Sequence, residues 1–349
     1  MSVLFDIGHP ADFHMFNAVK NELSRRGVES HIMLRDKEVS YQLAEKMGVP
    51  FIRGTSQRAG LLVGIEFFEW MQKTFKEIKK NNIKLVVSSG NPQSSIASWL
   101  RGVPHIVFND TETVKVGRFI YCFFSDKIYS SETILKNYGK KHVFYKGLHE
   151  LAYLDPRRFT PNPEVLEKLG VGKDEKYAIV RFVSWGATHD AGCNRMNKKE
   201  QEQLVGILKS SGYRVFISSE SPDVSESFKC DAFKVQPHLF HDSLAFASLV
   251  VGDGASTASE AALLGVPCIY ISDFADKLGY IKMLKERGLL EAEKDFTSGI
   301  EVMKKLINES QDLREIRKKA LDTLFKESVD VASYMADRCE EFLRKGEDK

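Results

Sequence analysis

The sequence predicts an α/β protein built from two doubly wound parallel-sheet domains. Its 349 residues exceed one ordinary hydrophobic core and suit two domains of roughly 150 residues each. Short apolar runs alternate with longer segments of helical period, which is typical of βαβ units and of a parallel sheet. Three prolines lie between positions 156 and 163, and a stretch this rich in proline favours a hinge between domains.

The first half alternates between expected strands and expected helices. The expected strands are Ser2–Ile7, Glu29–Leu34, Leu85–Ser88, His105–Phe108, Lys127–Tyr129 and His142–Tyr145, and the expected helices are Phe13–Arg26, Ser40–Met47, Gly64–Asn81 and Pro92–Arg101. Gly27, Gly48 and Gly102 follow three of these helices, as C-terminal glycine caps do.

The second half repeats this alternation and ends in a helical tail. Its expected strands are Tyr177–Val183, Arg214–Ser218, Ala232–Val235, Leu249–Gly252 and Val266–Ile271, and its expected helices are Lys198–Ser211, Asp242–Ala247, Ser256–Leu264 and Leu278–Arg287. From Ser310 to the end the chain is expected to be helical, with a bend near 328–330. We therefore expect one domain over 1–158, a second over 159–327 and a C-terminal helix over 328–349.

Composition narrows the classes of function. Lysine and arginine number 50 and aspartate and glutamate 48, so no strong net field favours a nucleic-acid partner. The first expected strand begins at Ser2, which leaves no room for a signal peptide, and no apolar run approaches the roughly 20 residues of a membrane span. The five cysteines are scattered without metal-like spacing and favour reduced thiols. These features predict a cytoplasmic protein.

Ligands of open parallel sheets bind beyond the carboxyl ends of strands, so the loops after strands carry the candidate site residues. In the first loop Gly8 permits a tight turn and Asp12 is placed to cap the next helix. His9 and His14 lie at the same edge, and a histidine accepts a proton near neutral pH. His14 is therefore a candidate general base, although hydrogen bonding within the loop would explain both histidines.

The loop after His105–Phe108 carries two carboxylates, Asp110 and Glu112, which could hold a sugar, an acceptor or a metal. Helix capping by Asp110 or Thr111 explains the same residues equally well. The chain contains no Asp-x-Asp sequence, so we predict that no metal or other cofactor is required.

The loop that opens the second domain runs from Arg181 to Asp190. Small polar residues such as Ser184 surround a glycine and let backbone amides approach an anion, to which Arg181 or His189 would add positive charge. Trp185 is placed to stack on a ligand or to cover the hinge. We count all five of these residues as candidate ligand contacts.

The loop after Leu249–Gly252 is the most specific. Its glycine turn, which includes Gly254, is followed by small hydroxyl residues, Ser256 and Thr257, that open a helix. Such a helix start offers amide groups and a positive dipole end to a diphosphate. Glu260 lies about one turn further, where its carboxylate would accept both hydroxyls of a ribose.

The segments 256–262 and 264–267 resemble the UDP-sugar motif of GT-B glycosyltransferases. The similar groups are the N-acetylglucosaminyltransferase that makes lipid II and the non-hydrolysing UDP-N-acetylglucosamine 2-epimerases. The resemblance implies a GT-B fold, in which two Rossmann-like domains face each other across a cleft. It further implies that Glu260 binds the ribose, that Ser256 and Thr257 bind phosphate, and that the segment around His238 contacts the base.

Over nearly its whole length the chain resembles domain-of-unknown-function family 354, a prokaryotic GT-B-like family. Four segments carry this resemblance: 6–10, 108–112, 150–154 and 181–190. In GT-B proteins the C-terminal helix crosses back to the first domain, so the resemblance implies the same for Ala332–Leu343. The chain lacks the transferases' glycine-serine-glutamine-glycine loop and the epimerases' His-Arg-Arg-Glu-Asn loop, having Ser184–Thr188 instead.

These features predict a metal-independent glycosyltransferase that takes a nucleoside-diphosphate sugar, in particular a UDP-sugar, for surface polysaccharide or glycoconjugate synthesis. His14 would act as base on an unknown sugar or lipid-linked acceptor. One alternative is a UDP-sugar 2-epimerase using Asp110, Glu112 and Glu132, and another is a non-catalytic nucleotide-sugar binder. The aromatic segment 61–78 admits at most peripheral membrane contact, and core packing explains its aromatics more simply.

Overall fold

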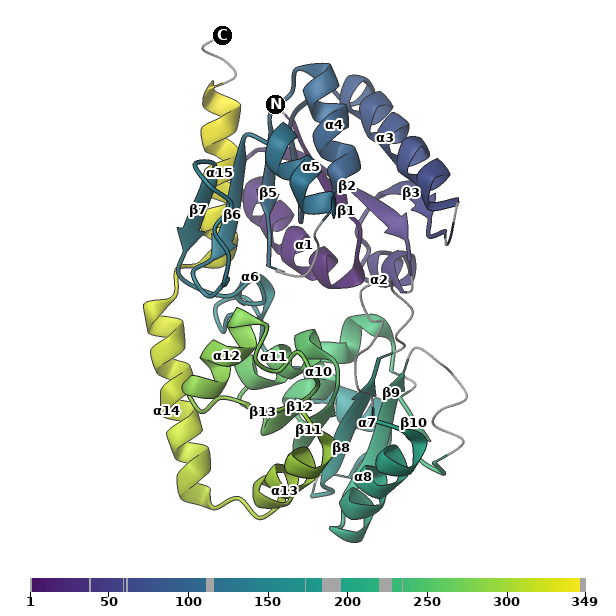
Figure 1. Ribbon diagram of the computed structural model, residues 1–349, viewed down its shortest axis with the longest axis vertical. Coiled ribbons are helices and arrows are strands. Elements are labelled where there is room, and N and C mark those ends of the chain that lie inside the picture. The colour runs from purple at the N-terminus through teal and green to yellow at the C-terminus, as the bar shows by residue number, and fades with distance from the viewer. Residues whose placement is uncertain are drawn as a thin grey trace. The chain divides into compact units, whose positions relative to one another are not determined.

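The computed structural model describes residues 2–37, 39–58, 60, 62–110, 116–172, 174–183, 196–219, 228–233 and 235–345. The chain divides into two compact units (Figure 1). Unit 1 comprises Met1–Arg158 and Glu327–Lys349, and unit 2 comprises Phe159–Lys326.

Unit 1 holds a parallel sheet with the strand order β3-β2-β1-β4-β5-β6-β7 over its described residues. The strands are β1 (Ser2–Ile7), β2 (Glu29–Asp36), β3 (Ile52–Ser56), β4 (Ile83–Ser88), β5 (His105–Phe108), β6 (Lys127–Ser131) and β7 (His142–Tyr145). The order reverses between β1 and β4, which makes this pair the topological switch point where doubly wound sheets bind ligands.

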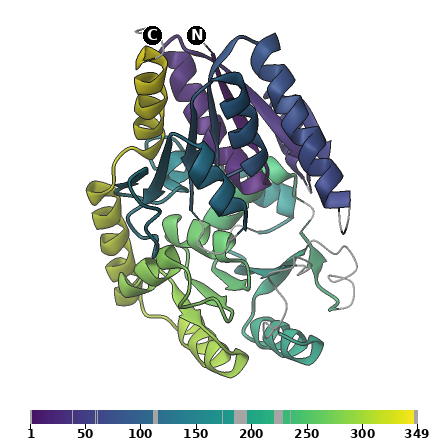
Figure 2. The same cartoon turned by 45° about the horizontal axis from the view of Figure 1, so that its top comes forward.

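Helices cover both faces of this sheet (Figures 1 and 2). They are α1 (Pro10–Arg25), α2 (Ser40–Lys46), α3 (Leu62–Lys80), α4 (Pro92–Arg101), α5 (Val116–Phe124), α6 (Leu151–Leu154) and α15 (Val331–Lys345). The helix α4 lies between α3 and α5, whereas α15 packs beside α1. Trp70 and Ile78 of α3 pack into the sheet's core with Leu4 and Met33, so core packing accounts for these two α3 side chains.

Unit 2 holds a second parallel sheet with the order β10-β9-β8-β11-β12-β13 over its described residues. Its strands are β8 (Tyr177–Phe182), β9 (Arg214–Ser219), β10 (Asp231–Ala232), β11 (Leu249–Gly252), β12 (Cys268–Ile271) and β13 (Glu291–Glu293). Its helices are α7 (Glu164–Leu169), α8 (Lys198–Ser210), η1 (Pro237–Leu239, a 3₁₀ helix), α10 (Phe240–Ala245), α11 (Ala255–Leu263), α12 (Gly279–Glu286), α13 (Phe296–Ile307) and α14 (Gln311–Glu327).

Local sequence signals fix several of the helix starts. Asn197 and Glu200 form a capping box at α8, in which each side chain bonds the backbone N–H of the other residue. Asp295 accepts a hydrogen bond from the backbone N–H of Ser298 and caps α13. Buried side chains of α8 and α13 then pack together on one face of the unit 2 sheet.

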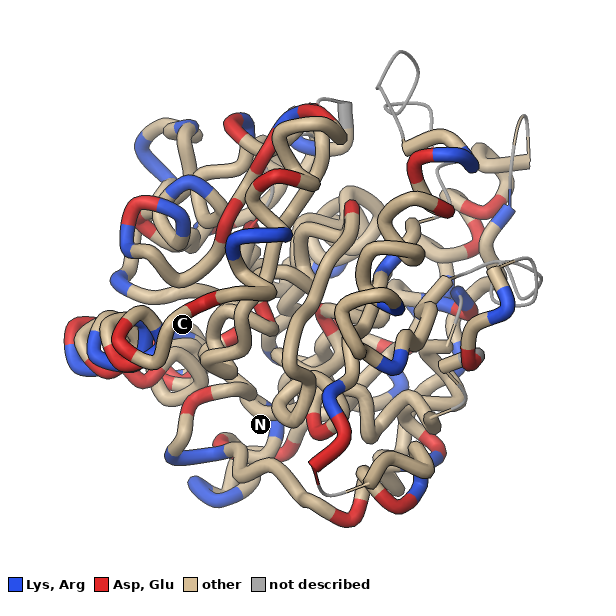
Figure 3. Tube along the Cα trace, turned by 90° about the horizontal axis from the view of Figure 1, so that it is seen from below, with Lys and Arg blue, Asp and Glu red and all other residues tan. Residues whose placement is uncertain are grey.

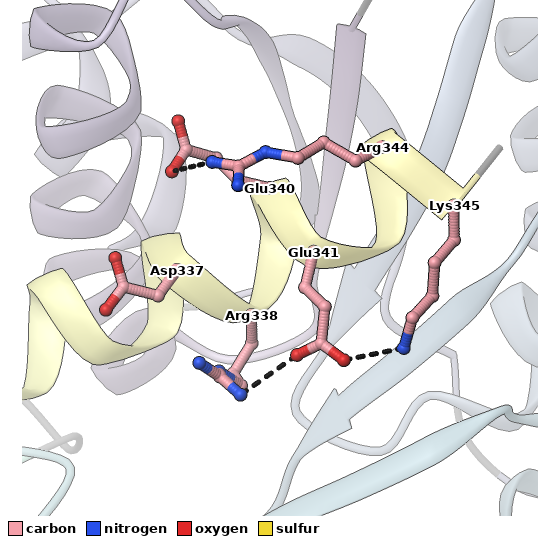
Figure 4. A pocket seen from close by; sticks show the side chains of 6 residues that line it. All are labelled: Asp337, Arg338, Glu340, Glu341, Arg344 and Lys345. Atoms are coloured by element: carbon pink, nitrogen blue, oxygen red, sulfur yellow. Dashed lines mark hydrogen bonds and ion pairs between the residues drawn. The ribbon is translucent and has the colours of Figure 1, made fainter. Parts of the chain in front are cut away.

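Basic and acidic residues are interspersed over the molecule (Figure 3). A depression of about 520 Å³ follows the C-terminal helix and is lined only by charged side chains of α15 (Figure 4). Glu341 pairs there with both Arg338 and Lys345, and Arg344 pairs with Glu340. The charged side chains pair with one another at the surface, so this depression is not a candidate ligand site.

None of the described helices is long and apolar enough to cross a membrane.

Candidate functional site

The register of the unit 1 sheet places the loops after β1, β4 and β5 side by side at one edge of the sheet. Asp6 of β1 pairs with Ser88 of β4, and Ser88 pairs with Val107 of β5. The residues that follow these strands therefore emerge together at the carboxyl edge of the sheet. This edge carries the candidate residues of the first two loops.

In the first loop Gly8 lies close to the side chain of Asn91. A Cβ at this position would lie 3.2 Å from the side-chain oxygen of Asn91, whose amide donates to the carbonyl of Asp6. The helix α1 begins at Pro10, and its N-cap residue is His9. Nδ1 of His9 accepts a hydrogen bond from the backbone N–H of Ala11. The expectation that Asp12 caps this helix is therefore wrong, because Asp12 already lies inside its first turn.

Asp12 is half-buried and accepts a hydrogen bond of 2.5 Å from the hydroxyl of Ser89. Burial raises the pKa of Asp12 to about 7, and the negative charge of Asp110 acts in the same direction. A carboxyl with a pKa near neutrality exchanges protons readily at physiological pH. Asp12, which was not a functional candidate in the sequence, is thus suited to acid–base chemistry.

His14 lies one turn along α1 and is half-buried. Its ring lies 5.4 Å from the ring of Tyr153 on α6 and 6.0 Å from that of Phe13. This packing fixes the plane of the imidazole at the N-terminal end of the helix.

Asp110 follows β5 and is half-exposed, and its Oδ2 lies 3.6 Å from Nδ1 of the buried His149. Desolvation would raise the pKa of Asp110, but the interaction with His149 outweighs it and holds this pKa below its ordinary value. His149 lies 39 positions further along the chain, just before α6, and was not a candidate in the sequence.

A buried histidine supports the loop after β4. His105 contacts the hydroxyls of Ser88 and Ser125 at 3.1 and 2.7 Å through its two ring nitrogens. Burial lowers the pKa of His105 to about 3, so the ring is neutral. The Ser88 hydroxyl accepts the backbone N–H groups of Gly90 and Asn91, which fixes the loop that presents Ser89 to Asp12.

In unit 2 the glycine turn after β11 presses against β8. Gly252 pairs with Arg181, and a Cβ on Gly252 would lie 2.1 Å from the carbonyl oxygen of Arg181. A Cβ on Gly254 would lie 2.9 Å from Cγ of the same arginine. Both glycines are therefore needed for close approach, and they bring Arg181 beside the start of α11.

Asp253 joins this turn to the loop that follows β8. Its Oδ1 accepts the backbone N–H of Val183 at 2.8 Å, and its own N–H donates to the Arg181 carbonyl. The guanidinium of Arg181 donates to the hydroxyl of Ser218 at 3.2 Å. Ser184, Trp185, His189 and Asp190 of the predicted loop, and Glu112 of unit 1, lie outside the described residues.

The helix α11 begins one residue earlier than expected, at Ala255, with Gly254 as its N-cap. Ser256 is exposed on its first turn and Thr257 is buried. Glu260 is buried, and its Oε1 lies 2.9 Å from Nε2 of the buried His241 on α10. His238 lies nearby in the chain, on η1, and is half-buried.

The structure adds four side chains that the sequence did not indicate as catalytic or ligand-binding: Asp12, Ser89, His149 and His241. Asp12 and Ser89 do follow strands, so their positions carried a signal. His149 and His241 lie in or beside short helices, and only the fold places them against Asp110 and Glu260. Among the described residues no group of three or more histidine, cysteine, aspartate or glutamate side chains is arranged to hold a metal ion.

Comparison with solved structures shows the fold. The UDP-N-acetylglucosamine 2-epimerase of Neisseria meningitidis, solved with UDP-N-acetylglucosamine, is 11% identical with a TM-score of 0.65, covering 99% of this chain and 100% of that one. MurG of Acinetobacter baumannii is 13% identical with a TM-score of 0.57, covering 98% and 100%. The glycosyltransferase VinC, solved with dTDP, is 11% identical with a TM-score of 0.63, covering 100% of both chains.

The chain has the GT-B fold. Identities this low establish the fold alone. No protein-family model matches the sequence, and a comparison with curated proteins found no match.

Proposed function

We propose that this protein is an enzyme that binds a nucleoside-diphosphate sugar, in particular a UDP-sugar, and transfers the sugar to a hydroxyl acceptor. The observation that carries the proposal is the start of α11, where the Gly252–Gly254 turn lies against Arg181 and Glu260 follows one turn later. Solved proteins of the same fold hold UDP-N-acetylglucosamine or dTDP.

The residues of unit 2 suit the nucleotide. The N–H groups at the start of α11 and the Ser256 hydroxyl would bind the diphosphate, since a helix N-terminus carries partial positive charge. Arg181 would add a full positive charge at the same point and stabilise the diphosphate as it leaves. The Glu260 carboxylate would accept the ribose hydroxyls, with His241 fixing its orientation.

We expect Glu260→Gln to weaken UDP binding about 10- to 100-fold, because hydrogen bonds to a charged acceptor contribute about 1.5–3 kcal/mol. Titration calorimetry of UDP against wild type and variant, without added metal, measures this. Glu301→Gln is the matched control, since Glu301 is an exposed carboxylate on α13. Equal affinity of all three proteins would remove Glu260 from the site, and the absence of binding to UDP, GDP, CDP and dTDP would end the proposal.

One observation favours 2-epimerisation as a second candidate. Elimination and re-addition of the nucleotide require acid–base groups around the sugar, and unit 1 brings Asp12, Asp110 and His149 together. Glu132, the further carboxylate expected for this reaction, follows β6 and is exposed. Incubating UDP-N-acetylglucosamine with the enzyme in D₂O separates the two reactions. Epimerisation would place deuterium at C2 of the UDP-sugar, whereas transfer would release UDP and leave the C2 proton in place.

The acceptor side of the proposal includes a lipid-linked sugar, which would require contact with a membrane surface. Phe119 and Phe123 lie one turn apart on α5 and are 78% and 68% exposed, and the neighbouring α4 exposes Trp99 and Leu100. Exposed aromatic side chains on adjacent helices are typical of interfacial membrane binding.

We expect Phe119→Ser/Phe123→Ser to reduce co-sedimentation with phospholipid vesicles about tenfold, because two apolar side chains that would insert into the membrane surface are lost. The control is Leu313→Ser/Ile316→Ser on α14, which removes another exposed apolar pair, 52% and 60% exposed, from unit 2. Wild-type protein that stays in the supernatant at every vesicle concentration would restrict the acceptor to a water-soluble sugar.

A further inference from the structure

His149 is a buried imidazole of unit 1. Its side chain is 7% exposed, and neither ring nitrogen has a hydrogen-bond partner among the described residues. A buried imidazole normally satisfies at least one of its nitrogens, since leaving a polar group unpaired costs free energy. This imidazole lies at the carboxyl edge of a parallel sheet, where the ligands of such sheets bind.

Asp110 lies on the Nδ1 side of the His149 imidazole. Its carboxylate oxygen lies 3.6 Å from Nδ1, which is within reach of a hydrogen bond after a small closure. A carboxylate at Nδ1 stabilises the tautomer with the proton on that nitrogen and leaves Nε2 as the acceptor. In this arrangement His149 would act as the base, and Asp110 would hold its ring in orientation.

The surroundings supply both signs of charge. Asp12 of α1 interacts electrostatically with Asp110 and with His149, and Lys37, just after β2, acts on Asp12. His9 in the first loop acts on Asp110, and the Tyr145 ring of β7 lies 6.0 Å from the His149 ring. Residues from the ends of three strands, β1, β5 and β7, therefore meet at the Asp110–His149 pair.

We propose that Asp110 and His149 form an acid–base dyad in which Nε2 of His149 takes the proton of the attacking hydroxyl. The inference deepens the proposed function and rests on it. As the acceptor O–H bond breaks, its proton goes to Nε2 and the oxygen forms a bond to the anomeric carbon. The bond from that carbon to the diphosphate oxygen breaks, and its electron pair leaves with the nucleoside diphosphate. The imidazolium that results is stabilised by the Asp110 carboxylate.

This assignment differs from the sequence-based choice of His14. The His14 ring packs on Tyr153, whereas His149 faces a carboxylate and has an unbonded Nε2 among the described residues. The two assignments of the base therefore predict opposite effects on activity for the matched variants His14→Gln and His149→Gln.

The dyad itself is tested without any substrate. Long-range ¹H–¹⁵N spectra of ¹⁵N-histidine-labelled protein, assigned with His149→Gln, report the tautomer of each ring. We expect the Nδ1–H tautomer for His149 in wild type, and we expect Asp110→Ala to lose this preference, since no carboxylate then faces Nδ1. An Nε2–H tautomer in wild type, or an unchanged tautomer preference in Asp110→Ala, would overturn the dyad.

The catalytic role is tested by UDP release from UDP-N-acetylglucosamine, UDP-glucose and UDP-galactose, beside UDP affinity. We expect His149→Gln to reduce release at least 100-fold with a UDP Kd within twofold of wild type, and His14→Gln to retain most of it. Full turnover in His149→Gln, or loss only in His14→Gln, would overturn the role. If wild type binds no nucleotide, the proposed function fails, the catalytic role falls with it, and the spectra decide whether the dyad exists.

Discussion

Arg158→Ala is expected to destabilise unit 1 by about 2–4 kcal/mol, because it removes the centre of a largely buried ion-pair network. Arg158 is the last residue of unit 1 before the chain enters unit 2, and Asp330 lies just after the chain returns. The guanidinium donates to both carboxylate oxygens of Asp330 at 2.7 and 2.8 Å and to Glu22 of α1 at 3.2 Å. The Arg158 side chain thus ties together the end of the first segment of unit 1, the start of its second segment and the helix α1.

The variant would leave two carboxylates incompletely paired. Partial burial would raise the pKa of Glu22, but hydrogen bonds from Arg26 and Arg158 hold it below its ordinary value. The pKa of Asp330 is held low in the same way, by the backbone N–H of Ser333 and by Arg158. Because the side chains of Arg158, Glu22 and Asp330 are 12%, 11% and 25% exposed, solvent screens part of the loss, and the expected figure is below that of a fully buried pair.

Urea unfolding followed by tryptophan fluorescence measures this effect in a Trp185→Phe background, where the remaining tryptophans, Trp70 and Trp99, both belong to unit 1. Arg25→Ala is the matched control, since Arg25 also pairs with Glu22 but is 65% exposed, and we expect it to cost under about 1 kcal/mol. Equal losses in the two variants would show that the network contributes no more than a surface ion pair.

The central strands were predictable because burial on both faces leaves one continuous apolar run. The bounds of the central strands β1, β5 and β11 agree with the sequence-based expectation at both ends, and so do those of the edge strand β7. The bend near 328–330 is also confirmed, since α14 ends at Glu327 and α15 begins at Val331. Two other edge strands, β3 and β13, were missed because their residues are few and mostly polar or half-exposed.

Five helices were missed: α6, α7 and η1 are only three to six residues long, and the two longer ones, α5 and α13, were missed for separate reasons. The sequence of α5, Val116–Phe124, is rich in aromatic and β-branched residues of modest helix propensity, and tertiary packing decides its state. The helix α13 did carry a signal, since Asp295 caps it and its buried side chains Ile300, Met303 and Leu306 follow helical spacing. The strand expected at Ala232–Val235 is reduced to β10, Asp231–Ala232, among the described residues.

The candidate site was predictable at the level of loops and less so at the level of pairs. A residue just after a parallel strand must lie at the ligand-binding edge, which selected Gly8, Asp110 and Gly254 correctly as members of those edges. The partners of Asp110 and Glu260 are 39 and 19 positions away, and such contacts follow from strand order and short-helix geometry. Local spacing does not encode them.

Asp6→Asn is expected to remove a pH dependence of up to about 4 kcal/mol in the stability of unit 1. Asp6 is fully buried at the end of β1, where its Oδ2 accepts the indole N–H of Trp70 at 2.8 Å and its Oδ1 has no partner among the described residues. Burial raises the pKa of Asp6 from 3.8 to about 7, although hydrogen bonds from Trp70 and Asn91 act in the opposite direction.

The sign follows from proton binding. Between pH 4 and 7 the folded state holds a proton on Asp6 that the unfolded chain has released, so the stabilisation is complete below the unfolded pKa and is lost as pH rises to about 7. Asparagine cannot titrate, so the free energy of unfolding of the variant relative to wild type should increase from pH 4 to pH 8. Asp12 titrates over the same range in both proteins and cancels from the difference.

Urea unfolding at several pH values, followed through Trp70 and Trp99 in the Trp185→Phe background, measures the difference. Asp36→Asn gives the matched control, because Asp36 is an exposed carboxylate on the neighbouring strand β2. A difference between Asp6→Asn and wild type that stays constant from pH 4 to 8 would mean that Asp6 is ionised in the folded protein. In that case the buried carboxylate would place a fixed negative charge beneath the first loop, next to the backbone carbonyl that accepts the Asn91 amide.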